Sequence, residues 1–507
     1  MKQKQLCRTL TAAAVLTAAM AIPAFASGWE QTTDGTWVYT DSSGSYVTDS
    51  WKKSGDYYFY LGDDGTLVTD SLIEDDGYYY YVDENGAMVT NRWVKLESTD
   101  DDDTDADYRW YYFGANGRAY QDTSSPKEIN GKKYMFDEEG RMLYGFVNEE
   151  GEMLTDDDAA LDATYYFGTA DDGTMYTGWL QVTEDLTDES YDDYDEIWMY
   201  FGSNGEKYAD STKTINGSKY SFDENGIMNY GWTDASSTAS SSNVSSTKYY
   251  STAADGHLQK NTWIYAIPSE DVNEDDYEDG TYRWFYANSS GYIVSNQAKK
   301  INSRWYVFDE DGIMQYGLVV MNDDSISSSS NQYIVSTLDE DEVTAEDIYE
   351  MGDAAGGDLN LFYFSSGESD GAMKKGTTVS IELADDTYTF GFASNGKAYN
   401  GIESKKYYKY GILQKADSDD KYALVEATEG KYVLANTAGT VVTSGTVKDG
   451  DGNYYAFHNG TIGYFAENDL ASKAATAYKN GSSTFTYDGD TYVVSDYLTA
   501  EYTEYTE

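Results

Sequence analysis

A short cassette of residues recurs along this chain, and repetition of this kind constrains the fold more than any other feature. Each copy has a run of aromatic residues, then an acidic or amide-rich turn that ends in Gly, then a small or apolar residue. Three early copies surround the turn glycines Gly44, Gly65 and Gly86, which are 21 residues apart. Alternating residues around an Asn-Gly or Asp-Gly turn are the strongest short-range signal for a β-hairpin. Each cassette therefore predicts one β-hairpin of about 20 residues.

The sequence also repeats with a longer period, which contains several hairpin cassettes. The segment that begins at Ile129 with Ile-Asn-Gly returns at Ile215 and, as Ile-Asn-Ser, at Ile301, 86 residues further on each time. This spacing predicts three tandem units of about 86 residues within 65–320, each with three hairpins. The predicted fold is all-β, a solenoid of stacked hairpins. We expect cell-wall-binding type repeats over 27–320, and divergent hairpin repeats with an acidic tail over 321–507.

Acidic segments interrupt each unit between its first and second hairpins, at 97–107, 184–196 and 270–280. Their place in the period makes them loop insertions at one edge of the repeat array. Asp271 to Asp275 has the carboxylate spacing of a calcium-binding EF-hand loop. However, Asp276 replaces the required Gly, and Tyr282 stands where a bidentate Glu is needed. We therefore expect a solvated anionic face and no metal site.

The charge and cysteine content exclude several classes of function. The chain has 90 acidic against 34 basic residues, a net charge of −56, and one Cys. Nucleic-acid binding needs Lys and Arg to displace phosphate counterions, so we expect no nucleic-acid partner. One Cys supports neither a disulfide framework nor a thiolate zinc site. With 52 Tyr and only 3 Pro, the chain is also unlike an intrinsically disordered protein.

Residues 1–26 have the pattern of a secretory signal peptide. Lys2, Lys4 and Arg8 precede an apolar, Ala-rich run, and a small-x-small cleavage pattern ends at Ala26. The run is shorter than the ~20 residues that a membrane-spanning helix needs. We therefore expect export, a mature chain 27–507 with no membrane span, and a location at the cell wall or outer surface.

The repeats resemble the cell-wall-binding repeat family. This family includes choline-binding modules of Gram-positive surface proteins, glucan-binding repeats of glucosyltransferases and C-terminal repeats of clostridial toxins. Its motif joins Trp-Tyr-Tyr-Phe, an Asp/Asn-x-x-Gly turn, a Met and Gly-Trp, and close copies run from Thr164 to Trp179 and from Tyr220 to Trp232. The resemblance implies a solenoid of hairpins with ligand sites between consecutive hairpins, made of aromatic side chains and often a Met. Departures from the motif, such as Tyr at Tyr57 and Leu at Leu318, leave the ligand open between choline and a glycan.

Aromatic residues two apart on a strand share one face, so Trp110 and Tyr112 form one face and Tyr111 and Phe113 the other. One face must pack against a neighbouring hairpin, and the other is free to form a ligand shelf. The alternative is that all of these rings are core, because each can bury 150–250 Å². A quaternary ammonium has no hydrogen-bond donor and is held by aromatic faces and negative charge; sugars stack on the same rings. The predicted ligand-binding residues are Trp93, Trp110, Tyr112, Trp179, Trp198, Tyr200, Trp263, Trp284 and Tyr286.

The predicted function is that of a secreted, non-catalytic surface protein of a Gram-positive bacterium, which binds wall teichoic-acid choline or a polysaccharide such as glucan. We predict no catalytic residue and no cofactor. The first alternative is a wall hydrolase with a small catalytic part within 320–507. The second is an adhesin or structural repeat protein with no small ligand.

Overall fold

The structure is a computed structural model that describes residues 28–98, 108–121, 124–183, 187, 191, 196–233, 244–327, 332–365 and 370–506. The predicted signal peptide and most of the acidic segments at 97–107 and 184–196 lie outside these residues. The chain divides into two compact units: Met1–Lys213 with Ser221–Met228, and Thr214–Tyr220 with Asn229–Glu507. Each unit is described by itself.

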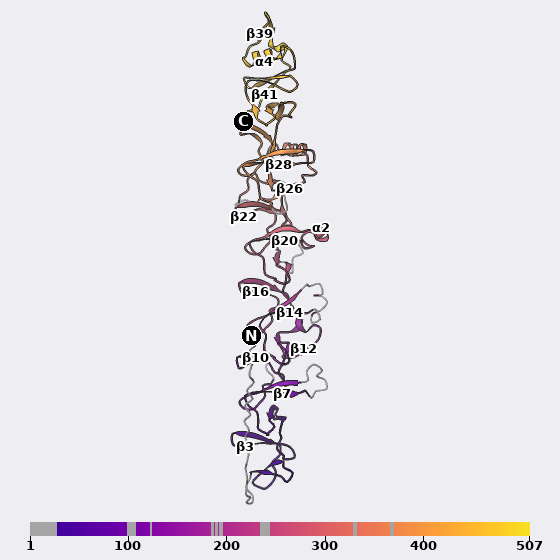
Figure 1. Cartoon of the computed structure of the whole chain (residues 1–507), viewed down its shortest axis with the longest axis vertical. Coiled ribbons are helices and arrows are strands. Elements are labelled where there is room, and N and C mark those ends of the chain that lie inside the picture. The colour runs from indigo at the N-terminus through magenta and orange to yellow at the C-terminus, as the bar shows by residue number, and fades with distance from the viewer. Residues whose placement is uncertain are drawn as a thin grey trace, which may run out of the picture. The chain divides into compact units, whose positions relative to one another are not determined.

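Unit 1 is a succession of antiparallel hairpins that follow one another in chain order (Figure 1). The paired strands are β1 (Gly28–Gln31) with β2 (Trp37–Thr40), β3 (Ser50–Ser54) with β4 (Tyr57–Leu61), β5 (Ser71–Asp75) with β6 (Tyr78–Val82), β7 (Arg92–Glu97) with β8 (Tyr108–Phe113), β9 (Lys127–Ile129) with β10 (Lys132–Tyr134), β11 (Gly145–Val147) with β12 (Met153–Leu154) and β13 (Tyr165–Phe167), and β14 (Gly178–Val182) with β15 (Ile197–Phe201). A short helix, α1 (Ala159–Asp162), follows β12. The strands β16 (Ser211–Ile215) and β17 (Ser218–Phe222) lie in the stretch of sequence where the two units meet along the chain.

Unit 2 begins with the same kind of hairpin and continues into larger sheets. Its first strands are β18 (Gly231–Thr233), β19 (Lys248–Tyr250), β20 (Thr262–Ala266), β21 (Arg283–Ala287), β22 (Gln297–Ile301), β23 (Arg304–Phe308), β24 (Met314–Gln315), β25 (Gly317–Met321), β26 (Ile334–Leu338) and β27 (Leu361–Phe364). A five-stranded sheet follows, in the order β28 (Thr377–Glu382), β29 (Thr387–Phe392), β32 (Ile412–Leu413), β31 (Lys406–Lys409), β30 (Gly401–Glu403).

The last sheet of unit 2 has seven strands. Its order is β33 (Tyr422–Thr428), β34 (Lys431–Asn436), β41 (Ala500–Glu504), β38 (Thr461–Phe465), β37 (Tyr454–His458), β36 (Thr446–Lys448), with β35 (Val441–Val442) beside β34. A separate hairpin joins β39 (Thr484–Tyr487) to β40 (Asp490–Val493). The helices are α2 (Glu274–Glu278), α3 (Ala345–Ala354) and α4 (Ala471–Lys479), with 3₁₀ turns at Val244–Ser246 and Val494–Asp496. The all-β fold prediction is therefore confirmed, with short helices added.

The turn after each hairpin shows why the cassette folds as it does. In the turn that ends at Gly86, the Asp83 carboxylate accepts hydrogen bonds from the backbone N–H groups of Asn85 (2.9 Å) and Ala87 (3.0 Å). Gly86 has φ of +78°, the left-handed region that Gly adopts without strain. The turn brings Met88 back toward the preceding hairpin, where its N–H donates to the Tyr58 carbonyl at 2.8 Å. Consecutive hairpins are therefore joined by a backbone hydrogen bond at the Met position.

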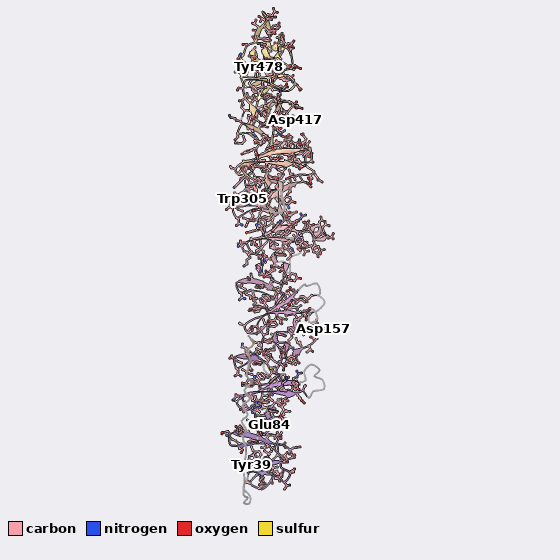
Figure 2. The ribbon with its side chains drawn as sticks, in the orientation of Figure 1. Tyr39, Glu84, Asp157, Trp305, Asp417 and Tyr478 are labelled. Carbon is pink, nitrogen blue, oxygen red and sulfur yellow. The ribbon has the colours of Figure 1, made fainter. Side chains whose placement is uncertain are left out.

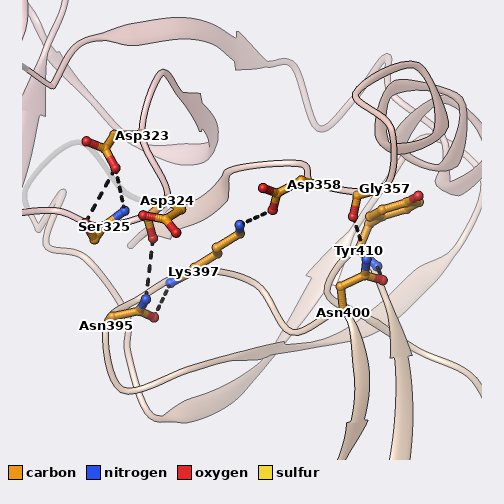
Figure 3. A network of polar contacts seen from close by, with 9 residues as sticks. All are labelled: Asp323, Asp324, Ser325, Gly357, Asp358, Asn395, Lys397, Asn400 and Tyr410. Carbon is orange, nitrogen blue, oxygen red and sulfur yellow. Dashed lines mark hydrogen bonds and ion pairs between the residues drawn. The ribbon is translucent and has the colours of Figure 1, made fainter. Parts of the chain in front are cut away.

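In the later part of unit 2, polar contacts tie loops together across long sequence separations (Figure 3). Lys397 Nζ lies 2.5 Å from the Asp358 carboxylate, and the Asn400 side-chain amide donates to the Gly357 carbonyl at 2.9 Å. Helix α3 packs its Ala345 and Ile348 into a core that also contains Phe390.

Aromatic cages between consecutive hairpins

The pairing of β7 with β8 fixes which aromatic side chains share a face. Trp93 lies opposite Tyr112, and Lys95 lies opposite Trp110, so the rings of Trp93, Trp110 and Tyr112 project from one face. Tyr111 projects from the other face, where it is buried against the preceding hairpin. The predicted division of the two faces is correct.

The face that carries Trp93 meets the next hairpin of unit 1. The Trp93 ring centroid lies 6.4 Å from Trp110 and 5.2 Å from Tyr112 of its own hairpin. It lies 4.8 Å from Tyr134 of the next hairpin, and Met142 belongs to the same cluster. The Met142 N–H donates to the Trp110 carbonyl at 2.7 Å, which holds the Met beside the indoles. Two Trp rings, two Tyr rings and the Met142 side chain are thus grouped between two hairpins, and we call this group cage D.

Unit 2 repeats this arrangement. The Trp263 ring centroid lies 6.2 Å from Trp284, 5.2 Å from Tyr286 and 4.8 Å from Tyr306. Met314 belongs to the same cluster. We call this arrangement cage J, and its three distances agree with those of cage D within 0.2 Å. Tyr286 is buried, whereas the two Trp side chains are half-buried and keep part of their surface accessible.

The second tandem unit places its predicted residues similarly. Trp179 lies 5.0 Å from Tyr200 and 5.8 Å from Phe222. Trp198 is half-buried, and its indole N–H donates to the Glu196 carboxylate at 2.8 Å. All nine predicted residues lie on hairpin strands, and eight of them make ring contacts with other aromatic side chains, whereas the contact described for Trp198 is the hydrogen bond to Glu196.

Sequence reasoning missed two cages near the beginning of unit 1. Trp29 and Trp37 line a cavity of about 320 Å³ together with Phe59 and Leu67. Trp29 also contacts Tyr39, labelled in Figure 2, at 5.4 Å between ring centroids. We call this cage A. The signal for it was present, because Trp29 and Trp37 occupy the same cassette positions as Trp93 and Trp110.

The second missed cage, cage B, joins the hairpin β3–β4 to the hairpin β5–β6. Trp51 lies 5.1 Å from both Tyr60 and Tyr80, and Met88 belongs to the same cluster. Trp51 precedes 65–320, the range that the 86-residue period covers, so the sequence pattern did not single it out. By contrast, the hairpin of Trp305 (Figure 2) has Ala298 at the position where cages D and J carry Trp93 and Trp263.

Comparison with known protein families identifies these repeats. Residues 47–93 match a family model described as a choline-binding repeat. The matched range contains Trp51, Tyr80 and Met88, the residues of cage B. Within this range the chain is therefore similar to a choline-binding repeat. No curated protein matches it.

Solved structures with some similarity come from Streptococcus pneumoniae. The modular autolysin LytC is 16% identical, with a TM-score of 0.33, over 58% of this chain and 54% of that chain. Choline binding protein F is 17% identical, with a TM-score of 0.26, over 74% of this chain and 98% of that chain. The choline-binding domain of CbpL is 19% identical, with a TM-score of 0.15, over 57% of this chain and 97% of that chain. The chain spans about half the length of the autolysin.

The cages differ in whether a lysine of the chain itself lies over their aromatic rings. Lys95 Nζ lies 4.6 Å from the Tyr108 ring centroid and 5.6 Å from Trp110 in cage D, and 3.0 Å from the Asp171 carboxylate. Lys53 takes the same position in cage B, 5.5 Å from Tyr58. In cage J this position is Tyr265, which packs against Trp284 instead. Cages B and D therefore hold a cation of their own beside the rings, and cage J does not.

The aspartates in the turns that follow cages D and J also differ in whether a cationic side chain pairs with them. Burial raises the pKa of Asp137, and the guanidinium of Arg141, 2.6 Å away, opposes this rise. Burial raises the pKa of Asp309 to about 7, and its side-chain partner is the neutral amide of Gln315 at 2.6 Å. The turn aspartate after cage J therefore has a neutral side-chain partner, whereas the turn aspartate after cage D has a cationic one.

Two further findings concern other kinds of site. The described stretches hold no group of three or more His, Cys, Asp or Glu side chains arranged to bind a metal ion. The segment with EF-hand-like spacing instead begins helix α2, where the Asn273 side chain caps the N-terminus by accepting from the Asp276 N–H. No helix among the described residues is both long and apolar enough to cross a membrane.

Proposed function

We propose that this protein is secreted, attaches to the cell wall by binding choline of wall polymers in its aromatic cages, and has no catalytic activity. The observation that carries the proposal is the repetition of one cage geometry in cages D and J. Five groups lie together in each cage: two Trp rings, two Tyr rings and one Met side chain. The family match over cage B supports the same ligand.

The chemistry of the cages suits a quaternary ammonium. Such a cation has no N–H to donate, so ring faces and surrounding negative charge supply its binding energy. Each cation–π contact contributes about 0.5–2 kcal/mol, and several cages along one chain multiply the retention on a polymer that carries many choline groups. The net charge of −56 adds a long-range attraction for cations, which weakens as salt rises.

Retention on purified wall sacculi tests the proposal. The mature chain 27–507 would be loaded at about 1 M salt, where the Debye length falls to ~3 Å, and eluted with choline or with a glucan oligosaccharide. We expect elution by choline. Elution by the glucan alone would replace choline with a glycan, and no retention would refute wall attachment. Clearing of the sacculi by the purified protein would refute the non-catalytic part of the proposal.

Substitutions in the cages make the test specific. We expect Trp93→Ala combined with Trp263→Ala to lower the choline affinity of cages D and J at least tenfold, because each loses one indole face and the packing around it. The matched control is Tyr57→Ala combined with Tyr487→Ala, which removes two exposed rings from other surfaces. Equal loss of choline binding in both double variants would argue against the cages.

A further inference from the structure

A cleft of about 710 Å³ opens beside cage J in unit 2. Its volume lies within the 300–1,000 Å³ range of ordinary small-molecule sites, and a choline headgroup would fill only a small part of it. Trp284 and Met314 of cage J form part of its lining. The rest of the lining comes from residues that do not belong to the cage.

One wall of the cleft is a row of aromatic rings. Tyr265 lies opposite Trp284 in the pairing of β20 with β21, with their ring centroids 4.7 Å apart. Tyr282 continues the row, 5.2 Å from Tyr265. The ring planes of neighbours are inclined by only 32–33°, so their faces are nearly parallel. Tyr265 and Tyr282 are 48% and 53% exposed, which makes this row an accessible surface.

The facing wall is anionic. Asp339, Glu340 and Asp341, which follow strand β26, line the cleft. The backbone N–H of Leu318 donates to the Glu340 carboxylate at 3.2 Å, which fixes this side chain at the wall. Within the described lining of the cleft, Arg283 is the one basic side chain. Its guanidinium makes two hydrogen bonds to the Asp276 carboxylate, at 2.6 and 2.7 Å, and so its charge is matched locally.

We propose that this cleft binds a flexible chain that carries two or more protonated primary amines, with one ammonium against the aromatic row and another against the carboxylates of 339–341. Carboxylates favour an ammonium that can donate N–H hydrogen bonds, which a quaternary ammonium cannot do. A phosphate attached to choline would meet like charge at this wall. The proposal goes beyond choline binding, because it assigns a second class of ligand to residues outside the cage.

Amine chains of this chemistry come from two sources, polyamines and lysine side chains of a peptide. Spermidine and a trilysine peptide are therefore the probes, titrated into the full mature chain by calorimetry at 0.15 M salt. We expect at least one of them to bind, and which one binds identifies the source. Absence of binding by both would overturn the proposal.

Because the whole protein is strongly acidic, specificity needs a matched control. We expect Asp339→Asn combined with Asp341→Asn to weaken the binding of the amine probe about tenfold, as two favourable charge interactions of about 0.5–1 kcal/mol each are removed. The control, Asp417→Asn combined with Asp419→Asn, makes the same charge change at exposed positions elsewhere in unit 2. Equal weakening in both double variants would show general attraction to an acidic protein and overturn the site.

Choline elution from sacculi, measured on the same variants, separates this proposal from the proposed function. We expect the Asp339/Asp341 double variant to keep its choline elution, because the rings of the cages are unchanged. Loss of amine binding with choline elution intact supports the cleft as a separate site. Amine binding that persists in this double variant overturns the site whatever the choline result.

Discussion

At the scale of single residues, the binding strength of a cage depends on what already lies over its rings. The Lys95 ammonium lies close to Tyr108 and Trp110 and pairs with Asp171. A choline entering cage D would have to displace this ammonium or share the same negative ring faces with it. The cages of one chain are therefore unequal, although their rings are arranged alike.

This leads to a prediction for Lys95→Met. Removing the ammonium should raise the choline affinity of cage D about two- to fivefold, which corresponds to the ~0.5–1 kcal/mol of an exposed cation–π contact. A choline titration followed through the indole N–H NMR signal of Trp110 measures the change. Lys431→Met, at an exposed position in unit 2, makes the same charge change and should leave this signal's titration unaltered. An unchanged or weaker affinity in Lys95→Met would show that Lys95 does not compete.

The sequence predicted which aromatic residues share a hairpin face better than it predicted which residues of the next hairpin contact that face. Alternation alone placed Trp110 and Tyr112 together, because the two-residue period of a strand is local geometry. The roles of Tyr134 and Met142 in cage D depend on which hairpin stacks next and in what register. That contact is set by the backbone hydrogen bond from Met142 to Trp110, between residues 32 positions apart, and no local pattern encodes it.

At the scale of the hairpin, the turn glycines connect folding to the cages. Gly173 has a positive φ of +51°, and a Cβ added there would overlap the Sδ and Cε atoms of Met142. The turn of a later hairpin therefore closes over the Met of cage D. Gly131, at the tip of the hairpin β9–β10, also has positive φ, at +80°, but an added Cβ would meet no atom within 4 Å.

The pair Gly173→Ala and Gly131→Ala separates backbone strain from packing. Both variants should lose about 1–2 kcal/mol of unfolding free energy, because Ala is strained at positive φ. Gly173→Ala should lose about 1–3 kcal/mol more through overpacking, and should weaken choline binding at cage D by displacing Met142. Urea unfolding together with choline titration measures both effects. Similar behaviour of the two variants would mean that Met142 moves aside without cost.

Elements in the later part of unit 2 were harder to predict than the hairpins. Helix α3 lies in a region where hairpin cassettes dominate the pattern, and its capping box of Thr344 and Asp347 is a signal of only four residues. Helix α4 buries Ala471, Ala474, Ala475 and Tyr478 at helical spacing, but three of these four residues are Ala, whose small side chains make the apolar pattern weak in the sequence. Strand β41 lies between β34 and β38 and pairs with β34 in parallel. The spacing of the repeats does not predict this long-range contact.

At the scale of the whole molecule, the abundance of Tyr makes stability sensitive to alkaline pH. Burial raises the pKa of Tyr455 to about 12, with Asp449 nearby adding to the rise. Burial also raises the pKa of Tyr478 to about 12, together with its hydrogen bond to Glu501. The unperturbed value is 10.0, so the unfolded chain releases these protons first. The stabilisation from each phenol is complete below pH 10 and is lost as the pH rises toward 12.

One buried cation acts in the opposite direction. Burial lowers the pKa of Lys207 from 10.5 to about 8, although its ammonium donates to the Ala160 and Leu161 carbonyls at 2.9 and 2.6 Å. Between pH 8 and 10.5 the unfolded chain holds this proton more tightly than the folded chain does, so the Lys207 contribution makes the fold more stable as the pH rises. The loss caused by the tyrosines should therefore dominate only above about pH 10.5.

We therefore predict a steep fall in unfolding free energy between pH 10.5 and 12, measured by urea unfolding followed by far-UV circular dichroism. A single phenol with a pKa near 12 accounts for up to about 2–3 kcal/mol at the upper end, and several such phenols act together. Tyr455→Phe should reduce the fall by the contribution of one buried phenol, because Phe has no proton to release. The control Tyr57→Phe changes a side chain that is 53% exposed and should leave the fall unchanged. A flat stability profile up to pH 12 would mean that the buried phenols ionise in the folded protein as readily as in the unfolded chain, and that the tyrosine-rich interior is open to hydroxide.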